Sequence, residues 1–396
     1  MKIIEYIYFF CYNYRRYKKK GLNSTKLKFF DLSKFDKKTK MYIGIGAGSI
    51  LLLFIILIVL KIAVGSRINS AVFESRIKNA AITYYKKYPD KLPKENGGKI
   101  SISADELVNA GNLKSLDKLL DKGLTCTGNV NVSNNNGYYL YQPIVECSDD
   151  YKTNLLYKKI LENNNIVESG NGLYKMNDFY IYRGENLNNH ANFAGHKWLI
   201  LRINNDNTIK IILDENIDTV VWDDRYNNQS EEFSGKNDYS ISRINSLLDD
   251  YFNNKYGDFK FSESNKSLIV PKSLCIGSVN ENAATFDDTV VCSQTTNEVK
   301  PLGLLQVNEF LLASLEPTCK KITDIQCSNY NYLNNISNTW TLNANTKNTY
   351  EVYHISRRVI SKRTDSYGKP NFVVNISSDA LYNSGNGSIS NPYIIK

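Results

Sequence analysis

The sequence predicts an α+β fold class, with a single N-terminal transmembrane helix ahead of a larger part built from helices and short strands. Three observations lead to this prediction. Residues 41–60, MYIGIGAGSILLLFIILIVL, form an uncharged apolar run, and at helical rise its length matches the hydrocarbon core of a bilayer. Six of the seven cysteines follow this run. Beyond it, apolar residues recur either at helical spacing or in short strand-like runs.

The positive charge of the chain lies before the apolar run. Residues 1–41 contain 12 basic and 3 acidic side chains, which accounts for the whole formal net charge of +9 and leaves 37 of each sign in the remainder. A nucleic-acid-binding protein carries its basic excess on the folded domain, so we exclude nucleic acid as a partner. A basic flank predicts a cytoplasmic N-terminus, with the C-terminal part on the extracellular side of the cell membrane.

The apolar run is interpreted as a retained, single-pass membrane helix at residues 41–64, after a basic cytoplasmic segment at residues 1–40. A cleaved leader is the alternative, because Ala63–Gly65 offers small residues, but an apolar run of this length exceeds a usual signal core. Gly44 and Gly48 form a GxxxG pair, which can let two such helices pack closely as a homo-oligomer; the alternative is that small residues are simply common in membrane helices.

Cysteine usage indicates an oxidising exterior. Cys11 lies on the predicted cytoplasmic side, and an even number of cysteines lies beyond the membrane segment, as expected for disulfides. We predict that consecutive cysteines pair, because each pair closes a short loop and each bridge stabilises by roughly 2–4 kcal/mol. A metal site is the alternative, but no CxxC motif or Cys/His cluster supports it. The predicted bridges are Cys126–Cys147, Cys275–Cys292 and Cys319–Cys327.

The segment after the membrane run has the pattern of an amphipathic helix followed by a small sheet. In residues 69–89, Phe73, Ile77 and later apolar residues recur at steps of three and four, and a proline ends the pattern. We expect this helix to continue the membrane helix outward. Ser103 and Glu106 then predict a capping box, and the runs GNVNVS and GYYLYQPIVEC predict strands.

Residues 41–148, with these features in this order, resemble the pilin-like modules of bacterial surface proteins. We delimit a pilin-like stalk domain at residues 66–148 and a linker at residues 149–177. A prepilin would show a Gly-Phe cleavage site with a Glu five residues into the mature helix, and GAGSILLLFIIL has neither. This difference favours a fixed anchor over assembly into a processed pilus.

The second domain, residues 178–396, contains the hairpin pattern KWLILRINNDNTIKIILDE. Trp198 and Ile209 are predicted on one face, and Ile203 and Ile212 on the other. Apolar residues on both faces indicate a central strand covered on both sides, so we interpret the hairpin as scaffold. Helices are predicted in SISRINSLLDDYFNNKYG and PLGLLQVNEFLLAS, and a C-terminal strand completes the α+β pattern.

This hairpin, the helix PLGLLQVNEFLLAS, WTLNA and GNGSISNPYIIK occur in the same order in a domain of unknown function on surface proteins of low-GC Gram-positive bacteria. That domain is similar to the C-type-lectin-like and formylglycine-generating-enzyme-like folds. The resemblance implies a C-type-lectin-like ectodomain whose role is display or binding at the cell surface.

No catalytic motif is evident, so we expect a protein that is not an enzyme. A Cys–His protease would combine Cys275 or Cys292 with His354, but cysteines bridged in an exterior domain supply no nucleophile. Formylglycine-generating chemistry uses reactive cysteines in a characteristic arrangement, which Cys319 and Cys327 do not reproduce.

We expect no cofactor, with calcium as the alternative. The resemblance to lectins directs attention to the fragments EPT and WDD, but neither has the expected position relative to Trp340. Calcium takes six to eight oxygen ligands that must converge. The segment LDENIDTVVWDD has the necessary density of carboxylates but no EF-hand spacing, so a solvated acidic loop is the simpler interpretation. Its acidic residues are Asp214, Glu215, Asp218, Asp223 and Asp224.

The aromatic residues supply the candidate binding site. Tyrosine occurs 28 times, and exposed Tyr or Trp rings beside Asn side chains suit sugar faces or protein hot spots. The expected function is non-catalytic recognition or adhesion at the cell surface, through a glycan, a wall polymer or a protein ligand. The alternatives are a structural pilin-like assembly subunit or spacer, and an ectoenzyme. The predicted ligand-binding residues are Trp340, Asn343, Asn345, Tyr330 and Tyr332.

Overall fold

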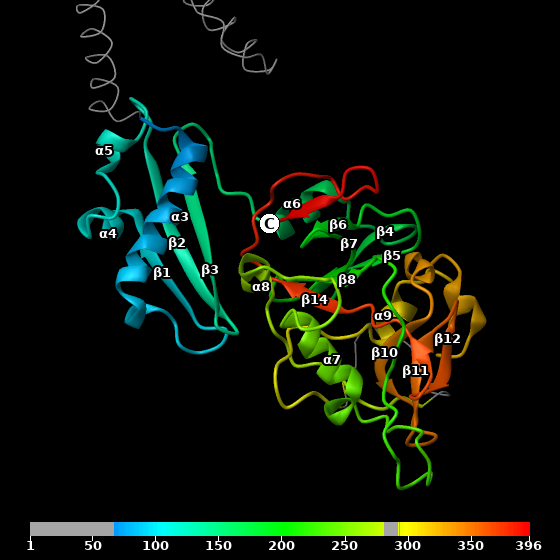
Figure 1. Cartoon of the computed structure of the whole chain (residues 1–396). Helices are drawn as coiled ribbons and strands as arrows, with labels where there is room; N and C mark the ends of the chain where they lie inside the picture. Colours follow the sequence, from blue (N-terminus) through cyan, green and yellow to red (C-terminus); the bar gives the residue numbers. More distant parts are fainter. Residues whose placement is uncertain (1–66, 281–291, 293) are drawn as a thin grey trace, which may run out of the picture. The chain divides into compact units, whose positions relative to one another are not determined.

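The computed structural model describes residues 67–280, 292 and 294–396, which belong to one compact unit, Arg67–Lys396 (Figure 1). The predicted cytoplasmic segment and the predicted membrane span at residues 41–64 lie outside the described residues. The same holds for Gly44 and Gly48, through which we predicted a homo-oligomer, and for Cys11.

The predicted fold class is wrong. The described part of the chain is a mixed α/β structure in which sheets dominate, and none of its helices is both long and apolar enough to span a membrane. Helix α3 (Ser70–Lys87) also has its own start, because the Asn69 side chain accepts a hydrogen bond of 3.0 Å from the Val72 amide. Ile68, just before this cap, pairs with Leu120 instead. The expected continuation of an upstream helix into α3 is therefore interrupted at this cap.

A small antiparallel sheet of order β1-β2-β3 packs with α3 (Figure 1). Phe73, Ile77 and Ala81 recur every four residues and are fully buried on the sheet side of the helix. The predicted capping box is confirmed, since Ser103 accepts from the Glu106 amide and the Glu106 carboxylate accepts from the Ser103 amide. The elements are β1 (Lys99–Ser103), α4 (Ala104–Asn109), α5 (Leu116–Leu119), β2 (Cys126–Asn135) and β3 (Tyr138–Cys147), with a 3-10 turn η2 (Pro89–Lys91).

The larger sheet has the order β14-β8-β7-β5-β4, with β6 paired to β7 and β15 paired in parallel to β6. Every residue of β8 is buried, which confirms the prediction of a central strand covered on both faces. Helix α6 (Leu156–Asn163) precedes this sheet in the chain. The strands are β4 (Gly172–Met176), β5 (Phe179–Arg183), β6 (His190–Phe193), β7 (His196–Ile203), β8 (Ile209–Leu213), β14 (Val373–Ile376) and β15 (Tyr393–Ile395).

A second antiparallel sheet and several short helices complete the part beyond residue 148. The predicted helix in SISRINSLLDDYFNNKYG is confirmed, whereas the one in PLGLLQVNEFLLAS is shorter than predicted. Its first predicted residues are extended, since Leu305 pairs with Thr341. The elements are β9 (Val220–Val221), α7 (Arg243–Phe252), α8 (Glu263–Leu268), α9 (Val307–Leu312), β10 (Thr339–Ala344), β11 (Glu351–Ile355), β12 (Val359–Arg363) and β13 (Tyr367–Gly368), with 3-10 turns η3 (Tyr239–Ile241), η4 (Ile325–Ser328) and η5 (Tyr332–Asn335).

A β-bulge in β7 changes which residues face each other in the hairpin. Ile200 lies opposite Ile211, but the register then shifts, so that Arg202 lies opposite Lys210 and Ile203 opposite Ile209. Residues directly opposite each other share one face of a sheet. The face predicted for Ile203 is therefore wrong, because the extra residue of the bulge moves it to the side of Ile209.

All three predicted disulfides are present: Cys126–Cys147, Cys275–Cys292 and Cys319–Cys327. The first joins the open ends of β2 and β3, where the two cysteines are directly opposite each other. The second joins Cys275 to Cys292 and closes a loop with a sequence separation of 17. The local pairing of consecutive cysteines is thus confirmed.

The double variant Cys126→Ser, Cys147→Ser should lose about 3 kcal/mol of unfolding free energy, because the bridge closes a loop with a sequence separation of 21. Denaturant titration of the full chain measures this loss. As a control, thiol titration of the unreduced, denatured wild-type chain should give one thiol per chain. A loss below about 1 kcal/mol would contradict the stabilising role of this bridge.

Candidate functional site

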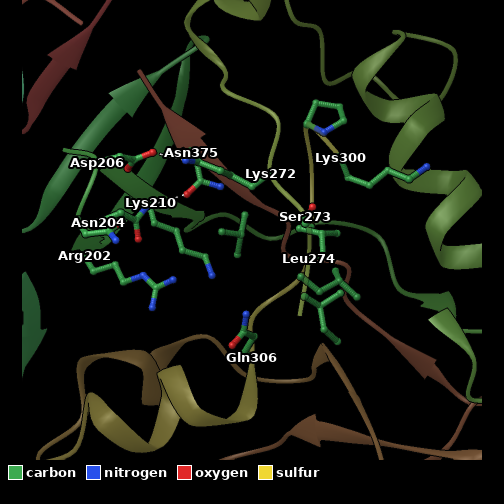
Figure 2. Close-up of a pocket in the computed structure, with 16 residues that line it drawn as sticks. Arg202, Asn204, Asp206, Lys210, Lys272, Ser273, Leu274, Lys300, Gln306 and Asn375 are labelled. Atoms are coloured by element: carbon green, nitrogen blue, oxygen red, sulfur yellow. Dashed lines mark hydrogen bonds and ion pairs between the residues drawn. The ribbon is translucent and has the colours of Figure 1, made fainter. Parts of the chain in front are cut away.

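A polar pocket of about 220 Å³ lies where the β7–β8 hairpin meets two extended segments (Figure 2). The hairpin supplies one wall, the segments around Lys272 and Lys300 supply another, and α9 begins below them. The lining residues are Arg202, Asn204, Asn205, Asp206, Lys210, Lys272, Ser273, Leu274, Lys300, Pro301, Gly303, Leu304, Gln306, Leu342, Val373 and Asn375.

Four cationic side chains line this pocket, and two of them come from the hairpin. Arg202 and Lys210 extend from neighbouring strands toward Gln306 (Figure 2). The Lys210 side chain is 8% exposed and that of Arg202 is 18% exposed. Lys272 and Lys300 belong to the opposite wall, and the Lys300 side chain extends away from Arg202 and Lys210 (Figure 2), where it pairs with Asp249. The sequence around the two hairpin cations is otherwise apolar, so both are surrounded by the core.

The bulge is the reason that Arg202 and Lys210 lie side by side. An uninterrupted register would place Leu201 opposite Lys210, but the shift after Ile200 brings Arg202 to that position. Like charges directly opposite each other on neighbouring strands destabilise a sheet. The local structure therefore requires a compensating negative charge.

Glu309 of α9 provides this negative charge. Lys210 Nζ donates a hydrogen bond to Glu309 Oε1, and Arg202 Nε lies 3.9 Å from the same oxygen. The backbone N–H of Gln306 donates a hydrogen bond to Glu309 Oε2 at 3.0 Å. Glu309 is only 2% exposed, so its carboxylate is stabilised almost entirely by protein groups.

Burial and pairing act on the pKa values of this group in a consistent way. Burial lowers the pKa of Lys210 to about 8, Glu309 opposes this shift, and Arg202 adds to it. Burial by itself would raise the pKa of Glu309, but Lys210, Arg202 and the hydrogen bonds outweigh it and leave the pKa of Glu309 lowered. At neutral pH the group therefore holds two cations and one carboxylate.

The charges of the pocket leave one cation in excess. Lys272 pairs with Asp206, Lys300 pairs with Asp249 at 2.8 Å, and Lys210 pairs with Glu309. Arg202 shares Glu309 only at the longer distance of 3.9 Å. Its Nε atom is buried and has no hydrogen-bond partner among the residues that the structure describes. Arg202 is thus the cation of the pocket with the weakest internal pairing.

The wall opposite the hairpin is held by a short backbone ladder and a disulfide. Lys272 and Lys300 exchange backbone hydrogen bonds of 3.0 and 2.8 Å, and the Thr296 amide donates to Leu274 at 2.9 Å. Cys275, the next residue, is bridged to Cys292. The ladder and the bridge together fix the spacing of the segments that carry the two lysines.

The turn of the hairpin forms a fixed polar rim. Asn204 Nδ2 donates to Thr208 Oγ1 at 2.9 Å and to Asn375 Oδ1 at 3.0 Å, while Asp206 accepts from Thr208 Oγ1 at 2.6 Å. Asn207 adopts a φ of +62°, a left-handed conformation that asparagine tolerates. These bonds leave an ordered edge of amide and hydroxyl groups beside the cations.

The five residues predicted to bind a ligand are not gathered on one surface. Trp340 is fully buried and donates from Nε1 to the Val220 carbonyl at 2.9 Å, and Tyr332 is also buried. Asn343 and Asn345 are buried as well; Asn343 donates to the Gly277 carbonyl and Asn345 to the Ser361 hydroxyl. Tyr330 is 56% exposed. Buried side chains with internal partners present no surface to a ligand, so only Tyr330 is placed to meet one.

Three of the five carboxylates of the acidic segment, considered as calcium ligands, have ion-pair partners in the protein. Asp223 pairs with Arg225, Asp224 with Arg243 and Glu215 with His196. Within the described ranges, no group of three or more His, Cys, Asp or Glu side chains could hold a metal ion.

The Cys–His arrangement considered from the sequence has no free thiol, because Cys275 and Cys292 are bridged to each other. His354 lies against Trp340, with a ring separation of 4.9 Å, in the core of the chain. Burial and then the neighbouring Lys362 lower the pKa of His354 to about 3, so this ring is neutral at physiological pH.

Sequence reasoning missed the pocket because it interpreted the hairpin as scaffold alone. One signal was available: Lys210 interrupts the buried run IKIIL, and a lysine inside a central strand needs a partner. The bulge that brings Arg202 beside it has no comparable signal in the sequence.

Comparisons with protein-family models, with curated proteins and with solved structures find no match to this chain. The resemblances noted from the sequence therefore stay predictions. The function has to be inferred from the pocket and its own residues.

Replacing Glu309 by Gln should lower the free energy of unfolding by about 3–5 kcal/mol, because Lys210 and Arg202 would remain buried without a counter-charge. Denaturant titration measures the loss. Glu232→Gln is the matched control: it removes a carboxylate from an exposed pair with Arg363 and should change stability by less than about 1 kcal/mol. Equal effects of both variants would contradict the role of Glu309.

Lys210 should make stability rise with pH. Its pKa is about 8 in the folded chain against 10.5 for a free side chain, so between these values the unfolded state binds more protons. The unfolding free energy of the wild type relative to Lys210→Met should therefore be constant below pH about 8. It should then increase up to pH about 10.5, with a slope of at most about 1.4 kcal/mol per pH unit. Paired denaturant titrations would detect this, and a difference that stays flat with pH would contradict it.

Proposed function

We propose that this chain is a non-catalytic recognition protein that acts outside the reducing cytoplasm and binds an anionic group of a glycan, wall polymer or protein. The pocket beside the β7–β8 hairpin is the binding site. The observation that carries the proposal is that Arg202 and Lys210 extend side by side into one pocket, whose charged groups and their partners leave one positive charge in excess.

The disulfides support the location. Bridges of this kind form and persist in oxidising compartments and are rare in the cytosol. One of them, Cys275–Cys292, begins one residue after Leu274 of the pocket wall. The resemblance to surface proteins of low-GC Gram-positive bacteria points to the same location.

The character of the lining residues supports binding over catalysis. The buried acid and base, Glu309 and Lys210, satisfy each other and are held as an ion pair. Neither histidine nor cysteine occurs among the described residues that line the pocket. The arrangement offers a fixed positive field and polar donors, which is what recognition of an anion requires.

Replacement of Arg202 by Ala should weaken binding of the full chain to anionic cell-wall fractions or acidic glycans about 10- to 100-fold. This range corresponds to the loss of one charge-assisted hydrogen-bonding group. Surface plasmon resonance on immobilised fractions, with neutral glycans beside them, measures the effect. Arg363→Ala is the matched control, because Arg363 is an exposed arginine outside the pocket and its loss changes the net charge equally.

Thermal unfolding of both variants should show that each is folded before binding is compared. Binding that is lost equally in both would indicate a general charge effect. Absence of any saturable binding by the folded, bridged wild type would contradict the proposed function.

A further inference from the structure

The size of the pocket limits its occupant to one small unit. Its volume of about 220 Å³ is below the range of pockets that enclose drug-sized ligands, which begins at about 300 Å³. A single sugar or polyol residue fits this volume, and a longer ligand would have to extend beyond the rim.

The charge of the pocket indicates the charge of the occupant. Each of the three lysines already faces a carboxylate, so Arg202 alone is available for compensation. A neutral ligand would leave Arg202 uncompensated. A dianion would bring one negative charge too many, close to the half-exposed carboxylate of Asp206 at the rim. A single negative charge is the best match.

The geometry of Arg202 indicates an oxyanion with two accessible oxygens. A planar guanidinium binds carboxylate and phosphate groups through parallel N–H donors, whereas an ammonium acts as a point charge. Arg202 lies over the Phe179 ring at 5.7 Å, a contact that restrains its orientation. Its buried Nε atom faces Glu309 Oε1 at 3.9 Å, so the terminal nitrogens of the guanidinium are the donors that a ligand would meet.

The other lining groups suit hydroxyls. Ser273 and Gln306 place a hydroxyl and an amide in the same pocket as Arg202 (Figure 2), and Asn205 also lines it. Amide side chains donate and accept at once, as do the hydroxyl groups of a sugar or polyol. Leu274 and Leu342 add apolar surface that can contact the C–H groups of such a ligand.

We infer that the pocket takes a singly charged oxyanion, a carboxylate or a phosphodiester, carried on a polyhydroxylated residue. Units of this chemistry occur in acidic glycans and in polyol-phosphate polymers. The inference rests on the proposed function and narrows its ligand class.

Isothermal titration calorimetry of the full chain tests it with defined probes. Methyl glucuronide and the phosphodiester of two glycerols carry one charge and several hydroxyls. Methyl glucoside lacks the charge, acetate and dimethyl phosphate lack the hydroxyls, and sulfate carries two charges. We expect at least one of the two hydroxylated monoanions to bind at least tenfold more tightly than every control probe. Tighter binding of methyl glucuronide would identify a carboxylate, and tighter binding of the glycerol phosphodiester would identify a phosphodiester.

Two variants separate the contributions. Arg202→Lys keeps the charge but loses the planar fork, and should weaken the preferred probe at least tenfold, while Arg363→Lys should leave its affinity unchanged. Ser273→Ala removes an exposed hydroxyl from the pocket wall. This variant should weaken the binding of the hydroxylated probes and leave the affinity for acetate unchanged. It gives a second test if Arg202→Lys does not fold.

The outcomes distinguish this inference from the proposed function. If sulfate, acetate or dimethyl phosphate binds as tightly as the hydroxylated probes, and Arg202→Ala removes that binding, the ligand class is overturned and anion recognition stands. Binding to anionic wall fractions without binding to any probe would likewise overturn the ligand class and leave anion recognition standing. If neither the fractions nor the probes bind to folded protein, the proposed function fails as well.

Discussion

The ion group formed by Glu309, Lys210 and Arg202 determines how this part of the molecule is built. The bulge in β7 sets two cations directly opposite each other, and only a carboxylate from outside the hairpin makes this tolerable. Glu309 comes from α9, 99 residues further along the chain than Lys210. The start of α9 is therefore tied to the hairpin, and Gln306 at that start faces the pocket.

Filling part of a core with this ion group is unfavourable in free energy. Removing charges from water costs several kcal/mol for each ion, and well-packed apolar residues at the same positions are often as stable or more stable. An apolar residue in place of Lys210 would also match the other residues of β8, all of which are buried. A local conflict of this kind is expected at functional or strained sites. Arg202, which lines the pocket and shares Glu309 only at 3.9 Å, favours the functional interpretation.

The features that the sequence predicted are those set by local patterns. The hairpin follows from two apolar runs around a polar turn, and the bridges follow from consecutive cysteines that close short loops. The N-cap at Asn69 was overlooked, although Asn is a favoured N-cap residue. Trp340 was misplaced, because an aromatic residue among asparagines is equally compatible with a core. The bulge and Glu309 depend on register and long-range contacts, which no local pattern encodes.

The disulfide beside the pocket connects the site to its environment. The wall that presents Lys272 and Lys300 is a short ladder of backbone hydrogen bonds, too small to be stable alone. The Cys275–Cys292 bridge begins one residue after Leu274 of this wall and limits how far its strands can separate. Reduction would remove this limit and leave the ladder between Lys272 and Lys300 to its backbone hydrogen bonds alone. The bond that favours an oxidising location therefore also supports one wall of the pocket, so the proposed location and the proposed binding site are linked through it.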